Sequence, residues 1–131
     1  MRKLVLLAAI ISTVLFTGGI ADAAPRSWSA SYRNGTAAGT AHYERINSIS
    51  GKLVVDGTLT VTSDGCYYVQ LIVSHDLVPV FHQSPQQCGP GSIPISLSDT
   101  TLFVTWSADL NVCQAGARPA CGQQVDVTVY G

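Results

Sequence analysis

Apolar and polar residues alternate at every second position along most of the chain, and this pattern restricts the fold more than any other feature. It begins near Trp28 and is clearest over residues 52–62, where Leu53, Val55 and Leu59 share one face of an extended chain. No segment of ten or more residues has apolar positions at the spacing of an amphipathic helix. The sequence therefore predicts an all-β protein whose strands bury one face and expose the other.

Turn-forming residues separate the alternating runs at short, regular intervals. Asn34-Gly35 is predicted to form a two-residue hairpin turn, and Ser98-Asp99 a later turn. Seven or eight short strands spaced in this way favour a two-sheet antiparallel sandwich, immunoglobulin-like or jelly-roll. Period two alone leaves a small closed barrel open as an alternative and does not give the strand order. The further alternating runs cover residues 66–75, 93–97, 102–106 and 125–129.

The first 23 residues have the organisation of a secretory signal peptide. Arg2 and Lys3 precede an uncharged apolar run that ends near Phe16, and the small-residue pattern of residues 21–23 follows. The apolar run is shorter than the roughly 20 residues that a membrane-spanning helix needs. We expect cleavage after Ala23, secretion of residues 24–131 as one domain, and no membrane insertion of the cleaved chain.

The charge of residues 24–131 argues against a nucleic-acid partner. Removal of residues 1–23 leaves five basic and seven acidic side chains, a net charge of −2. The basic residues are scattered along the chain, whereas phosphate binding needs clustered lysine and arginine.

Four cysteines, Cys66, Cys88, Cys113 and Cys121, lie in the part of the chain that is predicted to be exported. Thiols in an oxidising compartment persist as disulfides, so two bridges are expected. Four cysteines allow three pairings, and the spacing does not decide among them. Pairing of nearest neighbours is preferred because it closes the shortest rings, of 23 and nine residues counting both cysteines.

Two stretches carry a resemblance to a known group of proteins: SDGCYYVQLIV at residues 63–73 and CQAGARPACG at residues 113–122. Together with the N-terminal segment, they make the chain similar to small two-disulfide secreted β-sandwich proteins of actinobacterial type, whose function is uncharacterised. The resemblance implies secretion and a disulfide-stabilised β-sandwich, and it assigns no functional residue. This sequence has no counterpart of the reactive-site region found in proteins of the subtilisin-inhibitor type. It also lacks the Trp-Arg-Tyr turn of proteinaceous amylase inhibitors.

The ring from Cys113 to Cys121 contains Arg118, the only arginine after Lys52. A disulfide-braced loop could offer Arg118 to a trypsin-like protease, because preorganisation lowers the entropy lost on binding. Pro119 argues against this role, since the bond after Arg118 is then an imide without an N–H. The preferred interpretation is a stapled turn.

Histidines and carboxylates give no catalytic or metal-binding motif. His42 and Glu44 fall on one strand face, where a surface contact is expected rather than a zinc site, which needs three or four converging ligands. Ser74-His75-Asp76 contains the residue types of a catalytic triad, but neighbours on a strand point to opposite faces. We expect no cofactor and no catalytic residue.

Aromatic residues are the remaining candidates for a binding surface. Alternation places Trp28, Tyr32, Tyr67 and Trp106 inward, and Tyr68, Phe103 and Tyr130 outward. Outward aromatics supply large contact areas for sugars or protein partners. With Phe81 and Arg118 in neighbouring loops, they predict a non-catalytic extracellular module that binds a carbohydrate, the cell envelope or a protein. The alternatives are an inhibitor of a secreted protease or glycosidase and, with less support, a small secreted hydrolase.

Overall fold

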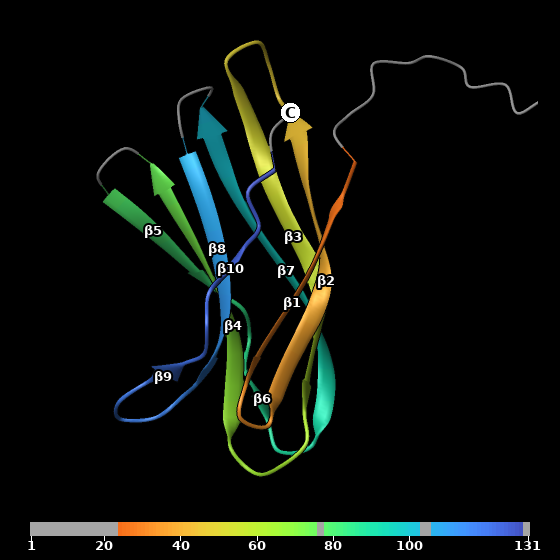
Figure 1. Ribbon diagram of the computed structural model, residues 1–131, viewed down its shortest axis with the longest axis vertical. Coiled ribbons are helices and arrows are strands. Elements are labelled where there is room, and N and C mark those ends of the chain that lie inside the picture. Colours follow the sequence, from red (N-terminus) through yellow and green to blue (C-terminus); the bar gives the residue numbers. More distant parts are fainter. Residues whose placement is uncertain (1–23, 76–77, 103–105, 130–131) are drawn as a thin grey trace, which may run out of the picture.

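A computed structural model of the protein describes residues 24–75, 78–102 and 106–129, and these form two antiparallel sheets (Figure 1). Sheet A has the strand order β1-β2-β3-β7, and sheet B has the order β10-β8-β4-β5, with β6 paired to β4 and β9 to β8. No described segment is a helix long and apolar enough to cross a membrane. The strands are β1 Arg26–Tyr32, β2 Gly35–Arg45, β3 Ser50–Val61, β4 Cys66–His75, β5 Val78–Gln83, β6 Gln87–Cys88, β7 Gly91–Leu102, β8 Trp106–Gln114, β9 Ala120–Cys121 and β10 Val125–Asp126.

The prediction of an all-β, two-sheet architecture is confirmed. The described residues contain ten strands rather than seven or eight. β6 and β9 have two residues each, too few to show a period, and β5 contains Phe81, which was predicted to lie in a loop. β10 falls within the predicted run over residues 125–129. The predicted signal peptide, residues 1–23, lies outside the described residues, as do Phe103 and Tyr130.

The core lies between the two sheets and is built from the inward face of each long strand. Trp28, Tyr67 and Trp106 are buried there, as alternation predicts, and the ring of Trp106 stacks on that of Tyr43 with centroids 6.3 Å apart. Burial of this apolar surface is the main term that stabilises the sandwich.

A pair of glycines makes room for the largest core side chain. Gly39 and Gly57 lie opposite each other on β2 and β3, and Trp28 lies beside Gly39 on β1. A Cβ atom on Gly57 would be 2.8 Å from Cζ2 of Trp28, and one on Gly39 would be 1.9 Å from the carbonyl oxygen of Asp56. Any side chain at either position would therefore displace the indole ring or the neighbouring backbone.

The first hairpin turn lies one residue earlier than predicted. Tyr32 pairs with Gly35, so the two turn residues are Arg33 and Asn34, and Arg33 has a φ of 50°. Gly35 is the first residue of β2, and a Cβ there would be 2.6 Å from the Tyr67 ring. The glycine is thus required by the core beneath it, whereas the sequence suggested that the turn required it.

Two predictions around β7 were wrong. Ser98 and Asp99 do not form a turn but lie inside β7, where they pair with Val54 and Leu53 of β3. The run over residues 102–106 is not one strand, since β7 ends at Leu102 and β8 begins in the other sheet. Turn-forming residues were overridden here by continuous pairing with the long strand β3.

Proline limits further strand pairing at the free edge of sheet B. Ser84 donates its backbone N–H to the carbonyl of Val69 on β4. Because the N–H groups of every second residue in a strand point to the same side, those of His82 and Val80 also face β4. Pro79 falls at the alternate position, whose nitrogen faces away from the sheet. The missing N–H therefore costs no bond to β4 and leaves the free edge with one donor fewer.

Pro94 occupies the equivalent position at the free edge of sheet A. Thr62 donates its backbone N–H to Asn34, which places the N–H groups of even-numbered residues of β3 toward β2. Thr58 is one of them, so its partner Pro94 belongs to a pair without ladder hydrogen bonds. Both edges thus carry a proline where it disturbs no pairing within the sheet.

Candidate functional site

Both disulfides join nearest neighbours, as preferred, and both lie on the outer face of sheet B. Cys66 pairs across the ladder with Cys88, and Cys113 with Cys121. Tyr68 shares this face, with Cys66 two residues before it and Cys113 directly opposite. Tyr68 is only 6% exposed, so its predicted role as an outward contact residue was wrong. It points away from the core as expected, but it is enclosed between the two disulfides.

The exposed part of the same face lies farther along the strands, toward the free edge. Phe81 of β5 is opposite Ile72 of β4, which is opposite Asp109 of β8. In the next row Gln83 is opposite Gln70. We call these five residues the Phe81 face. Phe81 is 54% exposed, Gln83 is exposed, and the other three are half-buried. Figure 1 shows β5 at the outer edge of the sheet, and five of its six residues are exposed.

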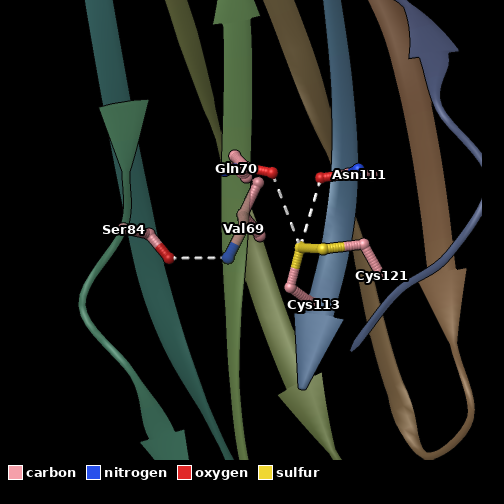
Figure 2. Close-up of a disulfide and its surroundings, with 6 residues drawn as sticks. All are labelled: Val69, Gln70, Ser84, Asn111, Cys113 and Cys121. Atoms are coloured by element: carbon pink, nitrogen blue, oxygen red, sulfur yellow. Dashed lines mark hydrogen bonds between the residues drawn. A yellow bond between two sulfur atoms is a disulfide. The ribbon is translucent and has the colours of Figure 1, made fainter. Parts of the chain in front are cut away.

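Amide groups occupy the border between the Phe81 face and the second disulfide. Figure 2 shows the side chains of Gln70 and Asn111 directed toward Sγ of Cys113, at 3.7 and 3.4 Å. A disulfide sulfur carries no hydrogen, so these are polar contacts to which the sulfur donates nothing. With its oxygen turned to the sulfur, the Gln70 amide directs its N–H2 group away, and no described residue accepts a hydrogen bond from that group.

Two carboxylates on this face have opposite electrostatic environments. Asp109 and Asp126 lie opposite each other on β8 and β10. Burial, together with the charge of Asp126, raises the pKa of Asp109. Hydrogen bonds from Thr128, whose backbone N–H is 2.8 Å from Oδ1, lower the pKa of Asp126, and Arg26 at 3.6 Å contributes in the same direction. Asp109 is therefore the carboxylate without a compensating partner.

Asp109→Asn should stabilise the fold at pH 7. Because the folded-state pKa of Asp109 lies above its ordinary value of 3.8, ionisation destabilises the fold as pH rises through that window. The variant should have a higher melting temperature than wild type at pH 7 and an equal one near pH 3. Asp126→Asn should behave oppositely, losing stability at pH 7 and matching wild type at low pH. Thermal unfolding at both pH values checks this, and a lower melting temperature for Asp109→Asn at pH 7 would contradict it.

A second exposed apolar group lies at the β2–β3 loop. Ile46 and Ile49 are 56% and 65% exposed. Oδ1 of Asn47 accepts hydrogen bonds of 2.9 Å from the N–H groups of Ile49 and Ser50, which fixes the loop. Neither isoleucine lies on a sheet face beside amide and carboxylate groups. A polar ligand at this loop would therefore meet fewer hydrogen-bonding groups to orient it than a ligand at Phe81.

The outer face of sheet A is lined by hydroxyl groups and contains a shallow hollow of about 430 Å³. Ala38 lies at its centre, with Ser29 opposite on β1 and Thr58 opposite on β3. The next row places Ser31, Thr36 and Thr60 side by side, and all five hydroxyl residues line the hollow. We call this feature the hydroxyl hollow.

A buried carboxylate joins the two sheets at their free edges. Asp99 of β7 is 8% exposed, and its two oxygens accept hydrogen bonds from Nε2 of His75 on β4 at 2.9 Å and Nε2 of His82 on β5 at 2.6 Å. Within residues 24–75, 78–102 and 106–129, no group of three or more histidine, cysteine, aspartate or glutamate side chains is arranged to hold a metal ion. We interpret these three residues as a cross-sheet clamp.

The other predicted candidates are dispersed. Arg118 is exposed at the tip of the β8–β9 loop, which projects away from the sheets in Figure 1. His42 and Glu44 make the expected surface contact, with Nε2 and Oε1 3.0 Å apart. The ring of His75 is directed to Asp99 in the clamp and not to a serine nucleophile. Neither the β8–β9 loop nor the His42–Glu44 contact lies on the Phe81 face. Among the predicted candidates that the structure describes, Phe81 is therefore the exposed aromatic residue on a sheet face.

Comparison of the chain with known protein families, curated proteins and solved structures gave no match. Gln70 and Asp109 were missed by sequence reasoning because they are polar residues on separate strands, and only the pairing of β5 with β4 and of β4 with β8 places them on one face with Phe81.

Proposed function

We propose that the protein is an extracellular, non-catalytic module that binds carbohydrate through the Phe81 face. The observation that carries the proposal is the exposure of Phe81 on a sheet face among amide and carboxylate groups. A half-exposed aromatic ring offers a flat apolar surface for the C–H face of a sugar. The amides of Gln70 and Gln83 and the carboxylate of Asp109 supply donors and acceptors for its hydroxyls.

The shape and rigidity of the face favour a polymer over a small ligand. All five residues lie on paired strands, so their positions are fixed before binding and little backbone entropy is lost. The face is the outer surface of a sheet next to its edge strand β5, a place that a chain or a solid surface can reach. The two disulfides are typical of an oxidising compartment, which supports an extracellular site of action.

Phe81→Ala should weaken binding to an insoluble polysaccharide by at least tenfold, or about 1.4 kcal/mol, because the ring provides the largest apolar contact. Residues 24–131 with intact disulfides would be co-sedimented with cellulose, chitin and purified cell-wall material. Ile46→Ala is the matched control, since Ile46 is an apolar side chain of nearly equal exposure outside the face.

Retention that is lost in Phe81→Ala and kept in Ile46→Ala would support the proposal. Failure of the wild-type protein to bind any of the polymers, or equal loss in both variants, would overturn it. In that case the favoured ligand would be a protein partner or a secreted enzyme that the protein inhibits.

A further inference from the structure

We propose that the hydroxyl hollow is a second saccharide site, for an uncharged glycan, on the opposite side of the molecule from the Phe81 face. The hollow itself is independent of the proposed function, whereas the two-sided arrangement rests on it. The hollow lies on the outer face of sheet A and the Phe81 face on the outer face of sheet B. The outer faces of a two-layer sandwich point in opposite directions.

The chemistry of the lining indicates the class of ligand. Its side chains are serine, threonine and alanine only, so it offers hydroxyl donors and acceptors around an apolar floor and no charge. A charged ligand would find no partner for its charge, while the hydroxyls of a neutral sugar can both donate to and accept from the lining. The volume of about 430 Å³ lies within the roughly 300–1,000 Å³ range of small-ligand sites.

The register explains why a hollow forms at this point. Ala38 stands where the neighbouring outward positions of β2 carry Thr36 and Thr40, so the shorter side chain leaves a depression between β1 and β3. One rim is fixed by the hydrogen bond between Oγ1 of Thr60 and Oγ of Ser92, 2.9 Å long. The side chains around the depression are short, so ordering them on binding costs little conformational entropy.

Filling the hollow should remove this site. Ala38 is exposed, so Ala38→Lys places a long side chain in the depression without disturbing the core. Ser96→Lys adds the same charge on the same sheet face but outside the hollow. Ala38→Gln fills the hollow without a charge and serves as a second variant. Thermal unfolding verifies that each variant is folded.

The binding test uses Phe81→Ala as the background, so that the hollow alone is measured. NMR titration with cellohexaose and with the hexamer of N-acetylglucosamine should show saturable binding to one of the two. Ala38→Lys and Ala38→Gln should weaken it at least tenfold, and Ser96→Lys should change it less than twofold. No saturable binding of either probe, or equal effects at residues 38 and 96, would overturn the proposal.

A suspension assay separates this proposal from the first one. With two sites, wild-type protein should clump polysaccharide particles and neither single variant should. Ala38→Lys should stay bound through the Phe81 face, while Phe81→Ala should keep only the residual retention, at least tenfold weaker, that the hollow provides. If only the hollow binds, Phe81→Ala will match wild type in retention and Ala38→Lys will abolish retention. That result would overturn the proposed function alone. If only the Phe81 face binds, Ala38→Lys will match wild type, which sinks this inference alone.

Discussion

Replacing both cysteines of either disulfide by alanine should lower the free energy of unfolding by about 3 kcal/mol. Cys66 and Cys88 are 22 positions apart, and Cys113 and Cys121 are eight apart. Each bridge limits the conformations of the unfolded chain, so its loss makes unfolding more favourable. For a domain of this size, the melting temperature should fall on the order of 15 °C per bridge.

Urea unfolding of the wild type and of the two paired variants measures these losses. The longer ring should contribute about 0.8 kcal/mol more than the shorter one, because loop-closure entropy grows with the logarithm of ring size. Wild-type protein in millimolar reductant should approach the variant that lacks all four cysteines. Losses below about 1 kcal/mol for both pairs would show that the bridges do not restrict the unfolded chain in this way.

Asp99→Ala should cost about 3 kcal/mol, because the variant loses two hydrogen bonds to a charged group. The carboxylate is 8% exposed and links His75 and His82 across the two sheets, whereas both disulfides join strands within sheet B. The two histidines are 25% and 33% exposed, so water replaces part of what they lose. We therefore expect the loss in free energy of unfolding to lie near the lower end of the range for two hydrogen bonds to a charged group.

A double-mutant cycle tests the clamp directly. Asp99→Ala combined with His82→Ala should cost less than the sum of the two single changes, because both remove the same hydrogen bond. Asp99→Asn, which keeps the shape and one acceptor oxygen, should lose less stability than Asp99→Ala. Strict additivity, or a loss below about 0.5 kcal/mol for Asp99→Ala, would show that the clamp does not contribute to stability.

The architecture was accessible from the sequence because period-two burial is a local property. Residues 66–75 were predicted as a strand with Tyr67, Val69, Leu71 and Val73 inward, and β4 has these bounds and this burial. The preferred nearest-neighbour pairing of the cysteines is confirmed, and in each case the two cysteines are opposite residues on neighbouring strands.

The features that sequence reasoning missed depend on which strands are neighbours. Asp99 was assigned to a turn, and only the placement of β7 opposite β4 and β5 brings it to His75 and His82. Tyr68 was correctly placed on the outward face, but its burial arises from cysteines on the same sheet face. Alternation indicates which face a side chain occupies, and it does not indicate what covers that face.

The candidate site shows the same division. Phe81 was predicted as a contact residue in a loop because it is an aromatic side chain outside the alternating runs, and it lies instead in β5. Gln70 and Asp109 carry no such signal, since single amides and carboxylates on outward strand positions are common and ordinarily solvated. Their place in the candidate site follows from the strand register, which sets Asp109 in the same row as Phe81 and Gln70 in the next row.

Backbone amide shifts, mapped during titration with a soluble oligosaccharide of the polymer that retains the protein, locate the binding surface residue by residue. Binding at the Phe81 face predicts saturable shifts concentrated at Phe81, Gln83, Gln70 and Asp109, with smaller shifts at the hydroxyl hollow. Shifts confined to the β2–β3 loop around Ile46 and Ile49, or to the β8–β9 loop around Arg118, would contradict carbohydrate binding at the Phe81 face.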